Sequence, residues 1–277
     1  YANLYLQQTE ALADPLTPLI TRAALASSVQ VEHPPHRNEA GFKLEYAGHS
    51  SDFAAQYFAA NDSLTGGTAF APKPPDPTSV GRDLYEWRAG HLSLVNVAPG
   101  NGAVLAGATF ASISPDTNAI AAGGRRVFFN VGSATYVRED GAITREVNHS
   151  GSFLSASPDG LQALLGDGCL YSLLSESCTD LTEGVGGFQG LSGQSDDLSH
   201  LFFVDTKVLP ATLREHNAFG EEPAEGKDNL YSWQQGSSPH YVATLIASAG
   251  SEAKENLSSD WASNPSARSA EASPDGR

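Results

Sequence analysis

The sequence has no methionine, only two cysteines and no apolar run of 18 residues or more. The last absence excludes a helix that spans a bilayer. The chain begins at Tyr1 without a recognisable signal peptide, and it ends on a turn signature with no strand after it. We therefore expect a processed product or an internal piece of a longer protein, for which a missing targeting signal is uninformative.

Positive charge is also scarce. Lys and Arg number 16 against 32 Asp and Glu, which gives a formal net charge of −16. Binding to nucleic-acid phosphates or to anionic lipid headgroups needs clustered cations, so this balance predicts no nucleic-acid partner and no membrane surface. The acidic surface is most simply a source of solubility.

The two cysteines, Cys169 and Cys178, lie in the segment GCLYSLLSESCTDLT. If this segment is a hairpin that turns near residues 175–177, the two side chains fall on facing strands. A disulfide is then expected in an oxidising compartment, with a pair of buried free thiols as the alternative. Because no other cysteine or histidine lies at ligand spacing nearby, the pattern predicts no metal site.

Helical periodicity is weak, whereas short apolar or alternating runs are frequent. Examples are GFKLEYAG, HLSLVNVA, RRVFFNVG and HLFFVDT. Clusters of Gly, Pro, Asn, Asp and Ser bound these runs, as they bound strands in hairpins. The sequence therefore predicts an all-β protein.

A Ser-x-Asp signature recurs along the chain. Its aspartates are Asp52, Asp116, Asp159, Asp197 and Asp275, separated by 64, 43, 38 and 78 residues. The shorter gaps match the about 40–50 residues of a propeller blade. Each longer gap contains an insertion, at 65–82 and 212–227. Pro, Asp and Gly suit a tight turn, because Pro presets φ, Asp bonds nearby N–H groups and Gly accepts positive φ.

A second marker, a tyrosine usually preceded by leucine, follows the turn in each unit, and a further turn and strand come after it. These tyrosines are Tyr5, Tyr85, Tyr136, Tyr171 and Tyr231. Each unit thus contains four antiparallel strands, and stacking such units around an axis buries their faces. We predict one β-propeller over 1–277 with about six blades represented, the terminal ones partial. Residues 1–44 match poorly, and 45–277 carry the repeats. In SISPDT a threonine replaces the usual glycine, so which aspartate marks that turn stays open.

The stretches SASPDG and DNLYSW resemble TolB-type propeller repeats, the WD-repeat-like units of exported bacterial proteins. Longer stretches, among them DLYEWRAGHLSLV and GKDNLYSWQQGSSPHYVATL, are similar to large uncharacterised exported propeller proteins of high-GC Gram-positive bacteria. The resemblance covers about residues 45–277. It implies an extracytoplasmic bacterial protein, secreted or at the cell surface, and a scaffold or binding role. The resemblance implies no catalytic residues in this chain.

The sequence shows no constellation of catalytic or cofactor-binding residues. The eight histidines are scattered, and no Gly-x-Ser-x-Gly elbow is present. The acidic insertions contain oxygen ligands for calcium but lack the alternating pattern that ends in Glu, so they read as solvated loops. Trp87 and Trp233 occupy equivalent places two residues after a blade tyrosine. Such aromatics either bind a ligand at the surface or, more simply, pack between blades.

These observations favour a non-enzymatic exported propeller scaffold that binds a protein or a cell-surface ligand, with no cofactor. One alternative is the propeller part of an enzyme that acts on polysaccharides or peptides, which needs paired acids converging in one pocket. Another is a carbohydrate-binding, lectin-like propeller, in which Trp87 and Trp233 would be exposed rather than packed.

Overall fold

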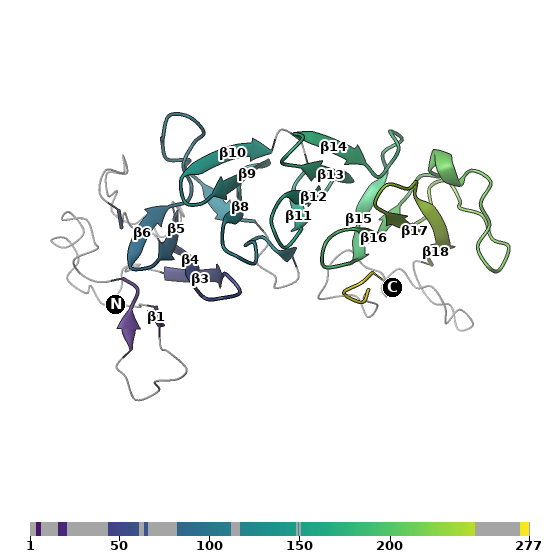
Figure 1. The fold of residues 1–277 in the computed structure, drawn as a ribbon. Coiled ribbons are helices and arrows are strands. Elements are labelled where there is room, and N and C mark those ends of the chain that lie inside the picture. The colour runs from purple at the N-terminus through teal and green to yellow at the C-terminus, as the bar shows by residue number, and fades with distance from the viewer. Residues whose placement is uncertain are drawn as a thin grey trace, which may run out of the picture. The chain divides into compact units, whose positions relative to one another are not determined.

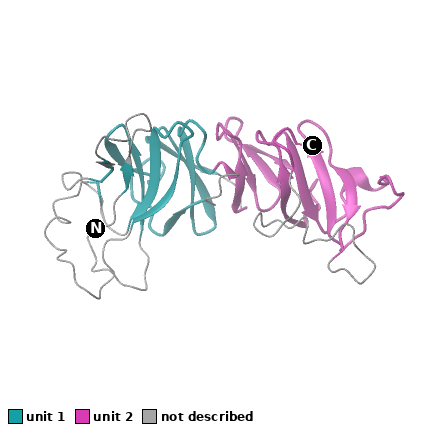
Figure 2. Cartoon of the chain, turned by 90° about the horizontal axis from the view of Figure 1, so that it is seen from below, with its two compact units in different colours: residues 1–113, 119–147 teal, residues 114–118, 148–277 magenta. Residues whose placement is uncertain are grey.

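The computed structural model of the 277-residue chain divides into two compact units (Figure 2). Unit 1 comprises Tyr1–Ile113 and Ala119–Val147, and unit 2 comprises Ser114–Asn118 and Asn148–Arg277. The structure describes residues 4–6, 16–20, 44–60, 64–65, 82–111, 117–147, 149, 151–246 and 272–276. Asp116, most of the insertion 65–82 and most of the segment 1–44 lie outside these residues.

Unit 1 contains two four-stranded antiparallel sheets, each built from consecutive strands (Figure 1). The first consists of β3 (Leu44–His49), β4 (Ala55–Ala60), β5 (Asp83–Arg88) and β6 (His91–Leu94). The second consists of β7 (Ala108–Phe110), β8 (Arg126–Val131), β9 (Ala134–Glu139) and β10 (Ile143–Val147). A separate pair is formed by β1 (Tyr5–Leu6) and β2 (Thr17–Pro18).

Unit 2 repeats this construction. Its first sheet consists of β11 (Phe153–Ala156), β12 (Gln162–Leu165), β13 (Cys169–Ser172) and β14 (Ser177–Asp180). Its second consists of β15 (Phe188–Gln194), β16 (His200–Asp205), β17 (Asn229–Gln234) and β18 (His240–Thr244). A short 3₁₀ helix, η3 (Pro210–Thr212), lies in the β16–β17 connection.

Strand composition follows the position of a strand within its sheet. The second strands are mostly apolar and buried: all six residues of β4 are buried, as are three of the four in β12. The outermost strand β14 has the sequence Ser-Cys-Thr-Asp, and all four residues are exposed. Polar residues on an outer strand discourage pairing with another chain.

The core of each unit lies between its two sheets. In unit 2, Leu164 and Leu170 of the first sheet cluster with Phe203, Tyr231 and other buried residues of the second. In unit 1 a second cluster likewise joins residues of β4 and β5 to residues of β7 and β8. Each sheet thus buries a face against its neighbour, because a single four-stranded sheet cannot cover both of its own faces.

The prediction of the fold class is confirmed. The described part of the chain is nearly all-β, and four antiparallel four-stranded sheets follow one another in chain order, consistent with the blades of a β-propeller. Four of the five tyrosines of the second marker fall in the third strand of a sheet, where Tyr85, Tyr171 and Tyr231 are buried and Tyr136 is partly buried. Tyr5 lies in the two-stranded pair and is exposed. The count of about six blades and the boundary near residue 45 stay predictions.

Candidate functional site

The Ser-x-Asp signature forms the turn between the first and second strands of a sheet. In the β15–β16 turn, Ser195 Oγ donates a hydrogen bond to Asp197 Oδ1 at 2.8 Å. The same carboxylate oxygen accepts the Ser199 N–H at 2.9 Å, and Ser195 Oγ in turn accepts the His200 N–H at 2.9 Å. The same three bonds recur in the β3–β4 and β11–β12 turns, which contain Asp52 and Asp159.

These hydrogen bonds stabilise the ionised carboxylates. Hydrogen bonds from Ser199 and from Ser195 lower the pKa of Asp197 to about 2. A hydrogen bond from Ser50, followed by one from the Ala54 N–H, lowers the pKa of Asp52. Because a carboxylate that accepts several hydrogen bonds is favoured in its charged form, both turns carry a fixed negative charge at neutral pH.

The last signature, at residues 273–276, packs against the turn of the preceding sheet. Ser273 Oγ donates to Asp275 Oδ1 at 2.6 Å, and Pro274 O accepts the Asp196 N–H at 3.0 Å. Gly276 has φ of 75°, and a Cβ at this position would overlap the side chain of His200. Glycine is therefore required both by the backbone conformation and by the close approach.

The sheet β7–β10 differs from the other three. Asp116 lies outside the described residues, and the turn that precedes β8 is formed by residues 121–124. Ala121 N–H donates to Arg126 O at 2.9 Å, as Ser195 N–H donates to His200 O at 2.8 Å. The first strand is interrupted after Phe110, and the ladder to β8 resumes at the Ile120–Val127 bridge. In sequence, SISPDT falls between these two pairings, and its residues 112–116 lie outside the described part of the chain.

A depression of about 410 Å³ in unit 2 lies beside two of the serine–aspartate turns. It is lined by Ser157, Pro158, Asp159, Leu161, Gln162, Ser172, Leu174 and Asp197. Leu174, in the β13–β14 connection, is 78% exposed. The depression thus combines apolar side chains with two carboxylates that are held by backbone and serine hydrogen bonds, and it can accept a ligand with both apolar and cationic groups.

The two tryptophans, considered above either as surface ligand contacts or as packing residues, pack against buried side chains. Trp233 is only 5% exposed and belongs to the core cluster between the two sheets of unit 2. Trp87 is partly buried and packs against the cluster that contains Tyr85. Alternate residues of a strand share a face, so each tryptophan follows its blade tyrosine, two residues earlier, into the core.

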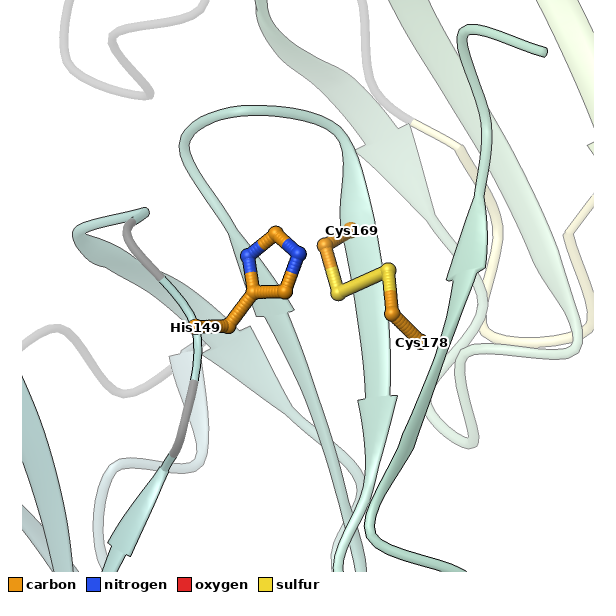
Figure 3. A group of neighbouring side chains, drawn as sticks. All are labelled: His149, Cys169 and Cys178. Carbon is orange, nitrogen blue, oxygen red and sulfur yellow. A yellow bond between two sulfur atoms is a disulfide. The ribbon is translucent and has the colours of Figure 1, made fainter. Parts of the chain in front are cut away.

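Cys169 and Cys178 form a disulfide that joins β13 to β14 (Figure 3). Tyr171 pairs with Cys178 in the β13–β14 ladder, so both cysteines lie on the face that Tyr171 uses. The structure also brings His149 to this disulfide: a ring nitrogen and the two sulfurs lie within 4.8 Å of one another. Sequence reasoning missed this contact, because His149 comes from the connection before β11 and no spacing pattern marks it.

The acidic insertion 212–227 does not gather its carboxylates around one point. Glu215 Oε1 lies 2.8 Å from His240 Nδ1, and Glu225 Oε1 lies 2.7 Å from Lys207 Nζ. Among the described residues, His149, Cys169 and Cys178 form the one cluster of three or more ligand atoms from His, Cys, Asp or Glu. The described structure therefore gives no support to calcium binding by this insertion.

No family model and no curated protein matches the sequence. Among solved structures, the chain is similar to a protein assigned as TolB from Agrobacterium tumefaciens, with 15% identity and a TM-score of 0.34. The match covers 72% of this chain and 64% of that one, so the chain spans less than two thirds of that protein's length.

Within the described residues, no helix has the length and apolar character needed to cross a membrane.

Proposed function

We propose that the chain is a non-enzymatic, exported β-propeller scaffold, and that it binds a basic and apolar segment of a partner protein, in solution or at a cell surface. The depression beside the β11–β12 and β15–β16 turns is the observation that carries this proposal. The two turns are held rigidly by their own hydrogen bonds, and loops on a rigid frame are the usual place for recognition.

Leu174 provides the apolar part of this surface. At 78% exposure it contributes little to the core, although it lies in the depression beside Leu161 and Pro158. Covering such a side chain with a ligand removes apolar area from water, which is worth about 1.5–3 kcal/mol for a leucine.

The charge of the surface favours a cationic ligand. Asp159 and Asp197 line the depression, and hydrogen bonding keeps Asp197 ionised at neutral pH. The whole chain adds a formal net charge of −16, which attracts basic segments and speeds their association.

Export is supported by the Cys169–Cys178 disulfide, since disulfides persist in oxidising compartments and are rare in the cytosol. A bacterial, extracytoplasmic setting agrees with the resemblance of the repeats to exported propellers. Both remain part of this proposal.

An enzyme that cleaves polysaccharides needs a general acid whose pKa is raised, opposite a second carboxylate. Asp159 and Asp197 do line one depression, but the pKa of Asp197 is lowered to about 2, so Asp197 is not suited to be the general acid. A lectin-like role needs exposed aromatic platforms, whereas Trp233 is buried. Neither alternative is favoured by the geometry of these residues.

The proposal is tested by fluorescence anisotropy with a labelled peptide in which Arg and Leu alternate, and with a matched peptide that has Asp in place of Arg. We expect the basic peptide to bind and its affinity to fall with added salt. Leu174→Ser should weaken binding about tenfold, because a leucine contact is lost.

The matched control is Leu213→Ser, which alters another exposed leucine, 67% exposed, outside the depression. This variant should bind the basic peptide as the unaltered chain does. Equal binding of both peptides, or equal affinity of the two variants, would contradict the proposal. Cleavage of the peptide during the measurement would contradict its non-enzymatic part.

A further inference from the structure

The environment of the disulfide contains the donor set of a transition-metal site. His149 and the two cysteine sulfurs lie within 4.8 Å of one another, and Figure 3 shows the imidazole ring directed at the Cys169–Cys178 pair. Imidazole nitrogen and thiolate sulfur are the preferred ligands of Zn²⁺, and two cysteines with one histidine leave a fourth position open.

The carboxylate of Asp167 lies beside the histidine ring. His149 Nδ1 lies 2.8 Å from Asp167 Oδ2, and in Figure 3 the other ring nitrogen, Nε2, lies on the side of the sulfurs. Asp167 Oδ1 is itself fixed by the Cys169 N–H at 3.2 Å. Histidines that bind zinc commonly contact a carboxylate through the nitrogen that does not bind the metal.

Two glycines let the segment that bears His149 approach the β12–β13 turn. A Cβ on Gly151 would overlap Asp167 and Leu165, and a Cβ on Gly166 would overlap the Ser152 side chain. A hydrogen bond of 2.7 Å from Gly166 N–H to Ser152 O joins the two segments. His149 is therefore placed beside the disulfide by packing and backbone bonding.

We propose that, once the disulfide is reduced, His149, Cys169 and Cys178 bind one Zn²⁺ ion, with water or an exchangeable anion in the fourth position. The Zn–S and Zn–N bond lengths of about 2.3 Å and 2.0 Å place tetrahedral ligands about 3.5–3.8 Å apart. The three ligand atoms already lie within 4.8 Å, so small side-chain movements complete the site. This inference goes beyond the proposed binding function and does not depend on it.

The disulfide-bonded form of the site is converted to the zinc-binding form by reduction. A phosphine reductant and one water molecule convert the disulfide to two thiols, and the phosphine becomes its oxide. Zn²⁺ then binds both sulfurs as thiolates, and the two thiol protons pass to the solvent. In the oxidised chain the sulfurs are bonded to each other, and zinc binding is not expected.

The test uses the tag-free 277-residue chain, reduced with a phosphine, with Zn²⁺ alone as the probe. We expect one ion per chain by competition with a chromophoric chelator. Co²⁺ substitution should give a thiolate-to-metal charge-transfer band and the visible bands of a tetrahedral ion. The oxidised chain and the double variant Cys169→Ser/Cys178→Ser should show neither signal.

Two further variants distinguish zinc binding by the histidine and both cysteines from zinc binding by the two free thiols alone. His149→Ala should weaken Zn²⁺ binding at least tenfold, and Asp167→Asn should weaken it by about 10–100-fold, the usual effect of losing such a carboxylate. His216→Ala, which removes an exposed histidine outside the cluster, should leave the affinity unchanged.

Several results would overturn the inference. His149→Ala could bind Zn²⁺ as tightly as the unaltered chain, or size-exclusion chromatography could show that zinc bridges two chains. Reduction of the disulfide could also abolish the circular dichroism signal of the β-sheets. In each case the three side chains would not form a site within one folded chain. None of these results bears on peptide binding by the depression, so the two proposals fail separately.

Discussion

Each serine–aspartate turn closes a small ring of hydrogen bonds between side chain and backbone. The serine hydroxyl donates to the aspartate and accepts the N–H that opens the second strand. The aspartate accepts a further N–H within the turn. Removing either side chain leaves backbone donors without their partner, which explains why the pair recurs together.

The substitution Asp197→Ala tests how much this ring of hydrogen bonds stabilises the fold, and how that contribution depends on pH. The pKa of Asp197 is about 2 in the folded chain, below the ordinary value of 3.8, so its ionised form stabilises the fold. This contribution is fully present above about pH 4 and is lost as the pH falls towards 2. Because the Asp197 carboxylate is exposed, we expect Asp197→Ala to lower the free energy of unfolding by about 1 kcal/mol at pH 7. This is less than the full pKa shift would give.

The measurement is urea unfolding of the unaltered chain and of Asp197→Ala between pH 7 and pH 2.5. Asp196→Ala is the control, since it removes a neighbouring charge while its backbone N–H still donates to Pro274 O. A difference between Asp197→Ala and the unaltered chain that stays constant down to pH 2.5 would contradict the electrostatic part of the explanation.

Some of these residue-level features could be predicted from the sequence. Ser and Asp in the order Ser-x-Asp predicted the turn, because their chemistry acts over three or four residues. The contact of His149 with Cys169 and Cys178 was not predictable, since it depends on the close packing of Gly151 against the β12–β13 turn. The burial of Trp233 follows from the period of two along β17, once Tyr231 is known to face the core.

The recurring turns also contact the next turn signature along the chain, which in unit 1 belongs to the next sheet. In unit 2 the Asp196 N–H donates to Pro274 O, and in unit 1 the Ser51 N–H donates to Ala122 O at 2.7 Å. The glycine two residues after each of these carbonyls, Gly276 or Gly124, has positive φ and packs on the preceding turn. The repeat therefore encodes both a turn and a contact between successive turns.

Gly124→Ala tests this contact against a matched glycine. Gly124 and Gly132 have nearly the same φ, 63° and 60°, but only at Gly124 would a Cβ approach Ala55 and Ser50 Cβ, each at 2.9 Å. Both variants incur the backbone strain of about 1 kcal/mol, and Gly124→Ala incurs about 1–3 kcal/mol more from overpacking.

Chemical denaturation of the two variants measures the difference. We expect Gly124→Ala to be clearly less stable than Gly132→Ala, where no atom lies within 4 Å of the added Cβ. Equal stability of the two would mean that the turns of adjacent sheets do not pack as described.

Across the whole chain, the order of strands, turns and tyrosines was sufficient to predict four-stranded antiparallel units. The break between the β7–β8 ladder and the Ile120–Val127 bridge was not predictable, because only the pairing with β8 reveals it. The depression was also beyond the sequence, since Leu174 and Asp197 belong to different sheets of unit 2.

Residue-resolved amide hydrogen exchange of the full chain tests the four-stranded repeat most directly. We predict the slowest exchange in the two middle strands of each sheet. We also predict protection of the amides of Ala55, Gln162 and His200, which donate to the turn serines at 2.9, 3.0 and 2.9 Å. Unprotected exchange at these three amides, or protected blocks that run across the turns without a break, would contradict the account.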